Sequence, residues 1–145
     1  MQQTKGAEVL TLITGVIGED VHIIGIRILE HALRKAGFNV VSLGIHVSQK
    51  EFIQAAIETK ANAILVSSLG GHAEILLRGF KESCIESGLK NVKLYLGGHL
   101  VIGELRWPDI ESRFKKMGFD AVYPPDVLPP KIVADLKRDL SLQPA

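Results

Sequence analysis

The sequence predicts an α/β fold in which helices cover both faces of one parallel sheet. Two observations lead to this prediction: five apolar, β-branched runs alternate with five helical patterns, and only short connections separate them. The chain has 145 residues, which is enough for one domain of ordinary size and leaves little room for a second. We therefore expect residues 1–145 to form a single domain, with flexible tails at about 1–7 and 141–145.

The predicted strands are the five apolar runs. The first and third are nearly continuous apolar stretches, which is typical of parallel strands that are buried on both faces. The five runs comprise residues 9–17, 39–43, 63–67, 92–96 and 121–123.

A helical pattern follows each predicted strand. The first helix is expected at 25–36 with Gly37 as its stop, the second opens at the capping box Ser48–Glu51, and the third spans 74–87. Pro108 and Pro129-Pro130 open the last two, because proline is favoured in the first turn. The residues expected to face the sheet are Ile28, Ala32, Ala36, Phe52, Ala55, Ala56, Ile110, Phe114, Met117, Ile132, Val133, Leu136 and Leu140.

Strict alternation with short connections implies right-handed crossovers between the strands. Five such strands suit the Rossmann-like, flavodoxin-like doubly wound sheet with the strand order 2-1-3-4-5. In open sheets of this kind, ligands bind outside the carboxyl ends of the strands, near the point where the strand order reverses. The loops that follow the strands are therefore where function should be sought.

Composition excludes several classes of protein. The chain has 17 Lys and Arg residues and 16 Asp and Glu residues, and this near balance argues against a nucleic-acid binder that relies on clustered positive charge. Cys84 is the only cysteine, which excludes an internal disulfide and a CxxC motif. No apolar run approaches the roughly 20 residues of a membrane span, and the polar start does not resemble a signal peptide. We expect a cytoplasmic protein that binds neither nucleic acid nor membrane.

Histidines gather in the predicted loops. Four of the five follow predicted strands, namely His22, His46, His72 and His99, whereas His31 lies on a helix. A single loop histidine is as often a solvated or capping residue as a functional one. His46 has no partner within a few positions, and we interpret it in that way.

Asp20-x-His22 is the most specific local feature. A metal-binding histidine usually donates its second ring N–H to a carboxylate, which fixes the tautomer and raises the basicity of the ligand. Asp20 alone also suits a phosphoacceptor, because response-regulator domains share this sheet. Those domains need an Asp after the third strand and a Lys after the fifth, where this chain has Ser67-Ser68 and Pro124-Pro125-Asp126. The phosphoacceptor interpretation therefore fails.

Paired glycines follow the third and fourth predicted strands. Gly70-Gly71, Gly97-Gly98 and Gly103 leave the backbone open to a bulky ligand and permit positive φ angles. No GxGxxG or GxxxxGK[ST] pattern follows the first strand, so neither a dinucleotide nor a nucleoside triphosphate is favoured.

Three motifs resemble the D-x-H-x-x-G, S-x-L and G-G signature of cobalamin-binding domains. They are Asp20-x-His22-x-x-Gly25, Ser67-x-Leu69 and Gly97-Gly98, in order and at the ends of the first, third and fourth strands. From about residue 15 to residue 140 the chain is also similar to the small (sigma, S) subunits of glutamate mutase, also called methylaspartate mutase. The likeness is carried by HALRKAGFNVVSLG, FIQAAIETKANAILVSSL, LYLGGHLVIG and WPDIESRFKKMGFDAVYPP.

The resemblance implies that the corrinoid is held base-off, with His22 as the lower axial ligand of cobalt and Asp20 as its hydrogen-bonding partner. Gly25 would let the nucleotide tail pass the first helix, and Ser67 would meet the dimethylbenzimidazole together with Leu69. The tail would need a deep slot beside the sheet, which small residues at the strand ends provide. The residues implied at the cofactor are Glu19, Asp20, Val21, His22, Ile23, Gly25, Ser67, Ser68, Leu69, Gly97, Gly98, His99, Leu100, Val101, Ile102 and Gly103.

The family's activity implies a role in glutamate fermentation. Adenosylcobalamin would lie between this subunit and a large catalytic subunit, in an assembly expected to hold two copies of each. The reaction would interconvert L-glutamate and threo-3-methyl-L-aspartate by radical chemistry. The sequence contains no convergent Arg cluster for two carboxylates, so no catalytic residue is expected in this subunit, which would be inactive alone.

Two other functions fit parts of the sequence. A corrinoid carrier or sensor could serve a methyltransferase or a regulator, but such modules usually carry a helical bundle before the sheet domain. A metal-dependent hydrolase could use His22, His72 and His99 as an open zinc site. The hydrolase is disfavoured, because Glu19 is the only carboxylate placed as an obvious base.

Overall fold

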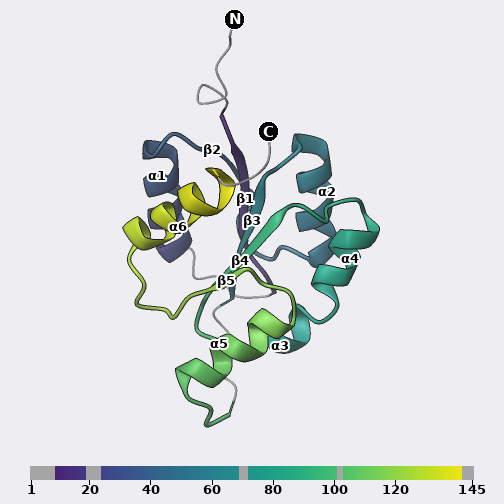
Figure 1. Cartoon of the computed structure of the whole chain (residues 1–145), viewed down its shortest axis with the longest axis vertical. Helices are drawn as coiled ribbons and strands as arrows, with labels where there is room; N and C mark the ends of the chain where they lie inside the picture. The colour runs from purple at the N-terminus through teal and green to yellow at the C-terminus, as the bar shows by residue number, and fades with distance from the viewer. Residues whose placement is uncertain (1–8, 19–23, 69–71, 101–102, 142–145) are drawn as a thin grey trace, which may run out of the picture.

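Five parallel strands form one sheet in the order β2-β1-β3-β4-β5, which confirms the predicted topology (Figure 1). The computed structural model describes residues 9–18, 24–68, 72–100 and 103–141. The strands are β1 (Thr11–Val16), β2 (Asn39–Ser42), β3 (Ala63–Ser68), β4 (Lys93–Gly98) and β5 (Ala121–Val122). Both β3 and β4 run one or two residues further than expected, so Ser68, Gly97 and Gly98 belong to strands and not to loops.

Helices cover both faces of the sheet. They are α1 (Ile24–Lys35), α2 (Gln49–Thr59), α3 (Ala73–Leu76), α4 (Phe80–Glu86), α5 (Trp107–Lys116) and α6 (Pro129–Ser141). Figure 1 shows α1 and α6 on one side of the sheet and α2 and α4 on the other. We call the first side the α1/α6 face.

Two hydrophobic clusters follow from this layering, because side chains alternate between the faces of a strand. Leu12 and Leu65 pack on the α1/α6 face with Leu136 of α6. Ile13 and Ile64 point the other way and join Phe52, Phe80 and Phe114 among others. The core is thus divided by the sheet, and each cluster fixes its own helices.

Most local signals act as predicted. The Ser48–Glu51 capping box is formed, and the hydrogen bonds from the Ser48 backbone and side chain lower the pKa of Glu51. Pro129 begins α6 as expected, and Pro108 lies in the first turn of α5, which starts at Trp107.

The prediction of one continuous helix over 74–87 is wrong. It is divided into α3 and α4, because Gly79 adopts a left-handed conformation with φ of 77°.

The inner stripe predicted for α1 is wrong at Ile28, whereas Ala36 packs against the cluster on the α1/α6 face as predicted. Ile28 is 56% exposed, whereas Ile26, Leu33 and the polar Glu30 are buried. Glu30 belongs on the inner face because its Oε2 accepts a 2.5 Å hydrogen bond from the hydroxyl of the fully buried Thr14 in β1. A polar pair within the stripe makes its period hard to read from hydrophobicity alone.

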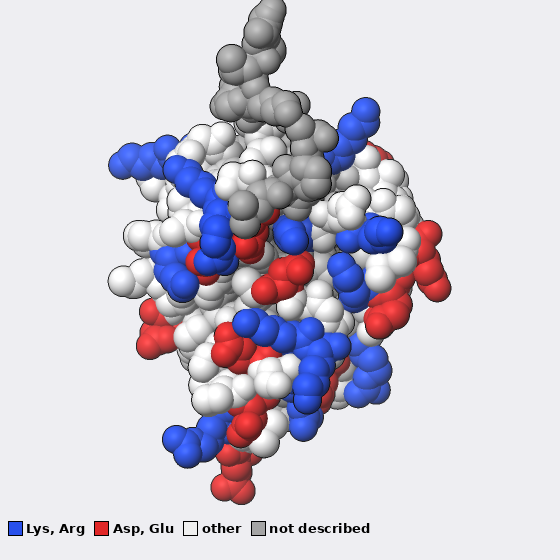
Figure 2. Space-filling view, viewed as in Figure 1, with Lys and Arg blue, Asp and Glu red and all other residues white. Residues whose placement is uncertain are grey.

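Charged side chains of both signs are interspersed on the face that Figure 2 shows. No described helix is long and apolar enough to cross a membrane.

The Thr14–Glu30 pair generates a stability prediction. Thr14→Val removes the donor to a buried carboxyl, and we expect the free energy of unfolding to fall by about 1–3 kcal/mol. The double variant Thr14→Val/Glu30→Leu should regain part of that loss, because both polar groups are then gone. Urea unfolding of the two single variants and the double variant gives the coupling.

The exposed hydrogen bond from Asn39 to Thr11 supplies the control. Asn39→Ala should cost less than about 0.5 kcal/mol. Additive losses at Thr14 and Glu30 would contradict the prediction.

Candidate functional site

A pocket of about 390 Å³ opens at the carboxyl ends of β3 and β4 on the α1/α6 face. Its walls come from the start of α1, from the ends of β3 and β4, and from the segment that joins β5 to α6. We call this pocket the slot. The described residues that line it are Gly25, Ile26, Ile28, Leu29, Leu65, Val66, Ser67, Tyr95, Leu96, Gly97, Gly98, His99, Tyr123, Pro124, Pro125, Val127, Leu128, Pro129 and Ile132.

The slot exists because side chains become small toward the strand ends. Leu65 of β3 is opposite Tyr95 of β4, and two residues later Ser67 is opposite Gly97 on the same face. A Cβ at Gly97 would lie 3.8 Å from Tyr123 Cβ, which is an ordinary van der Waals contact. The side of the slot formed by Tyr123 therefore lies close to Gly97 without a steric clash. A Cβ at Gly25 would meet nothing within 4 Å, so the α1 side is open.

Glycine is required at Gly98 for its backbone conformation. Its φ of 111° is a conformation that residues with a side chain rarely adopt. Of the paired glycines at the end of β4, Gly97 therefore leaves space in the slot, and Gly98 permits the backbone conformation.

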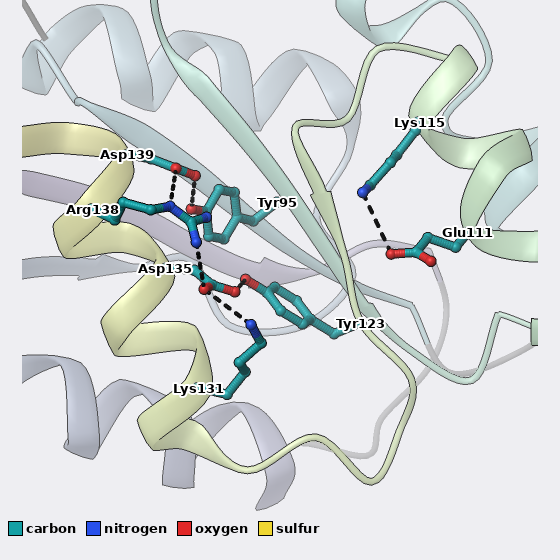
Figure 3. A network of polar contacts seen from close by, with 8 residues as sticks. All are labelled: Tyr95, Glu111, Lys115, Tyr123, Lys131, Asp135, Arg138 and Asp139. Atoms are coloured by element: carbon teal, nitrogen blue, oxygen red, sulfur yellow. Dashed lines mark hydrogen bonds and ion pairs between the residues drawn. The ribbon is translucent and has the colours of Figure 1, made fainter. Parts of the chain in front are cut away.

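Helix α6 holds the two tyrosines of the slot through their hydroxyls (Figure 3). Tyr123 donates a 2.7 Å hydrogen bond to Asp135, and Tyr95 donates one to Asp139. Lys131 and Arg138 form ion pairs with Asp135 at 3.2 and 3.3 Å. The two rings, with centroids 5.9 Å apart, thus form a wall whose orientation α6 determines.

The network also sets protonation. Burial and the hydrogen bond to Asp135 raise the pKa of Tyr123, and burial and the bond to Asp139 raise the pKa of Tyr95. Burial opposes ionisation of Asp135, but hydrogen bonds from Tyr123 and Lys131 and the nearby cations outweigh it, so the pKa of Asp135 is lowered. At neutral pH the tyrosines are neutral donors and Asp135 is a charged acceptor.

The slot brings together five of the residues that sequence analysis places at the cofactor. These are Gly25, Ser67, Gly97, Gly98 and His99.

Other predicted residues lie elsewhere. Ser68 is buried and does not line the slot, and Leu100 packs in the cluster on the opposite face from α1. Gly103 is exposed, with φ of 55°. Ser68, Leu100 and Gly103 therefore contribute no wall to the slot. The remaining predicted residues, Glu19, Asp20, Val21, His22, Ile23, Leu69, Val101 and Ile102, lie outside the described residues.

Sequence reasoning missed the wall built by Tyr95, Tyr123 and Leu128. The first two carry core-like signals, and only the structure shows that their rings also face a pocket. Leu128 could have been found, because the rule on carboxyl ends of strands applies to the loop after the fifth strand as well.

The histidines of the described loops do not converge into a metal centre. His46, His72 and His99 are exposed, and His46 has a positive φ of 59°. Within the described ranges, no group of three or more His, Cys, Asp or Glu side chains is placed to hold a metal ion.

The slot's position and its small, open strand ends agree with a known family. A family described as the B12 binding domain matches residues 10–124, and the chain belongs to this family. The chain is 53% identical over 133 residues to the glutamate mutase sigma subunit of Clostridium tetanomorphum, covering 92% of this chain and 97% of that protein. It is 55% identical, with the same coverage, to the glutamate mutase sigma subunit of Carboxydothermus hydrogenoformans.

A solved structure shares the fold. A cobalamin-binding protein from Desulfitobacterium hafniense superposes with a TM-score of 0.75 at 21% identity, over 91% of this chain and 60% of that one. Family and fold together support cobalamin as the cofactor.

The wall network generates a prediction on pH. Because the pKa of Asp135 is lowered on folding, its charge contributes stability above its unfolded value near 4, and this contribution is lost as pH falls through the lowered value. Asp135→Asn should therefore lower the free energy of unfolding by about 1–3 kcal/mol at pH 6, with a smaller loss at pH 3. Urea unfolding across this range measures the difference.

The exposed Asp126, in the loop before α6, provides a matched control. Asp126→Asn should change stability by less than about 0.5 kcal/mol at either pH. A deficit for Asp135→Asn that stayed constant or grew toward pH 3 would contradict the assignment.

Proposed function

We propose that the chain is the cobalamin-binding subunit of an adenosylcobalamin-dependent glutamate mutase, folded as a single domain over residues 1–145. Its role is to hold the cofactor for the interconversion of L-glutamate and threo-3-methyl-L-aspartate by a large catalytic subunit. The observation that carries the proposal is the slot, because its lining contains residues of all three cobalamin-binding motifs: Gly25, Ser67, and Gly97 with Gly98. Relatives named as glutamate mutase sigma subunits, at 53% and 55% identity, favour this function over a corrinoid carrier.

The slot fits the nucleotide tail of a base-off corrinoid. Its volume lies within the range of small-molecule sites, and its lining is mostly apolar with a few polar groups, as such sites require. Gly25 leaves the α1 side open, and Ser67 offers a hydroxyl that can donate to a ring nitrogen of the base. The backbone at Gly97 and Gly98, with His99 beside it, would meet the ribose and phosphate.

His22 is assigned as the lower axial ligand, and Asp20 as the acceptor of its other ring N–H. The hydrogen bond would keep the imidazole in the tautomer whose free nitrogen faces the metal and would raise its basicity. Both residues precede α1, whose first residues line the slot. A ligand on this segment and a tail in the slot would therefore hold the corrinoid at two points.

The substrate residues are assigned to the partner subunit. Among the described residues lining the slot there is no Arg or Lys to bind a dicarboxylate substrate. When bound, adenosylcobalamin would supply the carbon radical for this reaction. This chain orients the cofactor, and the large subunit, in an assembly of two small and two large chains, binds the amino acid and excludes water.

The axial ligand can be tested directly. His22→Ala should weaken cobalamin binding and abolish the ¹⁵N coupling from protein histidine in the cobalt(II) electron paramagnetic resonance spectrum. A ¹⁵N-labelled protein in which that coupling survives the substitution would show that another group binds cobalt.

Asp20→Asn should have a milder effect than His22→Ala. Loss of the partner of a metal ligand typically costs about 10- to 100-fold in affinity, so the histidine coupling should remain while binding weakens. His46→Ala is the matched control, since it changes an exposed loop histidine outside the slot lining, and it should leave both readouts unchanged.

Binding of the cofactor and of the large subunit should be mutually dependent. If the corrin is held between the two, cobalamin raises the affinity of the subunits for each other, and the large subunit raises the affinity for cobalamin by the same factor. Calorimetric titrations with and without each component measure both factors. Factors close to one, or methylaspartate formation by the purified chain alone, would contradict the assigned roles.

A further inference from the structure

The short helix α3 does not continue into α4, and this break changes the pairing of its last carbonyl. Gly79 lies between the two helices with a left-handed φ of 77°. The N–H of Phe80 donates to Leu77 O, whereas in a continuous helix it would donate to Leu76 O. The carbonyl of Leu76 therefore needs a donor from another part of the chain.

Gln49, the first residue of α2, supplies that donor. Its Nε2 donates to Leu76 O at 2.7 Å and to Arg78 O at 3.1 Å, so one amide group binds two carbonyls at the end of α3. The capping box at Ser48 fixes the start of α2, and with it the backbone from which the Gln49 side chain extends. The position of α2 thus determines where α3 ends.

Other contacts hold α3 from its remaining sides. Ala73 and Leu77 are buried in the core on the face opposite α1. Arg113 of α5 forms a 3.0 Å ion pair with Glu74 of α3, and Figure 1 shows the two helices near each other. Both charged side chains are partly exposed, so the ion pair adds little stability. Burial and the Gln49 amide are therefore the main restraints on α3.

Helix α3 in turn contacts the chain just after β1. Gly18 has φ of 82°, and a Cβ there would lie only 2.8 Å from Leu76 Cδ1. The Leu76 side chain therefore packs directly on the backbone of Gly18. The N–H of Gly18 donates to Val47 O at 3.3 Å, which restrains Gly18 from a second side. His22, assigned above as the axial ligand, follows Gly18 by four residues.

We propose that Gln49 and Leu76 are positioning residues for the axial ligand of cobalt. Gln49 fixes the end of α3, and Leu76 fixes the direction in which the chain leaves β1 toward His22. The proposal rests on the proposed function, because it takes His22 as the ligand. Neither Gln49 nor Leu76 lines the slot, so contact with a nucleotide tail bound there does not account for their role.

The physical basis of the proposal is preorganisation. Part of the free energy of a coordination bond is spent on ordering the segment that carries the ligand, and a fold that restrains this segment beforehand lowers that cost. Glycine has more backbone freedom than any other residue, so Gly18 needs restraint from its neighbours. Leu76 supplies this restraint, and Gln49 keeps Leu76 in place. Loss of one such contact should weaken binding at least about threefold.

The test uses Gln49→Met and Leu76→Ala in the full chain. Gln49→Met retains a long side chain without the donor, and Leu76→Ala removes the atoms that contact Gly18. Each should weaken cobalamin binding at least about threefold and reduce the share of cobalt(II) that shows ¹⁵N coupling from protein histidine. Equilibrium dialysis and electron paramagnetic resonance measure the two effects, and urea unfolding establishes that each variant is folded during the titration.

Matched controls lie on the same two helices. Gln54 of α2 donates to Glu58 on the exposed surface, and Ile75 of α3 is 68% exposed. Gln54→Met and Ile75→Ala repeat the same kinds of change without removing a contact to the end of α3 or to Gly18. Both variants should leave cobalamin affinity and histidine coupling unchanged.

A His22→Ala background separates positioning from a general structural role. This background has no axial imidazole to position, so adding Gln49→Met or Leu76→Ala should cause no further loss of cobalamin affinity. An equal loss in both backgrounds would show that the two residues support the cofactor in another way, which would overturn the inference.

The remaining outcomes distinguish the inference from the proposed function. A chain without substitutions that fails to bind cobalamin would overturn both. Cobalamin bound without histidine coupling would overturn the assignment of the axial ligand, and the inference with it. Full affinity and full coupling in Gln49→Met and Leu76→Ala, in a chain whose coupling is lost in His22→Ala, would overturn the inference alone.

Discussion

The site depends on one packing constraint: on the α1/α6 face, the neighbouring strands β3 and β4 change from large to small side chains at the same level. Leu65 and Tyr95 fill the space beneath the helices, and two residues later Ser67 and Gly97 leave it open. Because β3 and β4 are parallel and paired in register, the change from large to small side chains occurs side by side on the two strands. The result is one continuous slot. A single larger residue at Gly97 would approach Tyr123 and narrow it.

The wall of the slot has a structural cause of its own. A tyrosine hydroxyl that is removed from water needs a partner, and α6 supplies one for each ring through Asp135 and Asp139. Asp135 is itself buried, and Lys131 and Arg138 balance its charge from the solvent side. The same bonds that stabilise α6 on the sheet thus hold the aromatic rings of the slot in place, which links the stability of the fold to the shape of the site.

Much of the fold could be predicted, because apolar runs and turn residues act locally. Sheet order, the capping box and the prolines that open helices follow from such signals. The inner face of α1 could not be predicted in this way, since the buried Glu30 is satisfied by Thr14, a residue distant in sequence. Small residues at strand ends could be recognised as candidates for the site. Tyr95 and Tyr123 could not, because a ring that faces both a core and a pocket has the same sequence pattern as one that faces a core alone.

The described lining of the slot contains no Lys, Arg, Asp or Glu, which bears on how the two subunits would divide their roles. A phosphate bound at the open end of the slot would stay near solvent, so it would not require a buried cation, and the described lining has no Lys or Arg. Recognition of the tail by the slot would then depend on shape and on apolar surface, which act at any salt concentration. Charged recognition of the amino-acid substrate needs convergent cations in a closed site, and this is the contribution expected of the large subunit. A small domain with nearly balanced charge is sufficient for the first task and unsuited to the second.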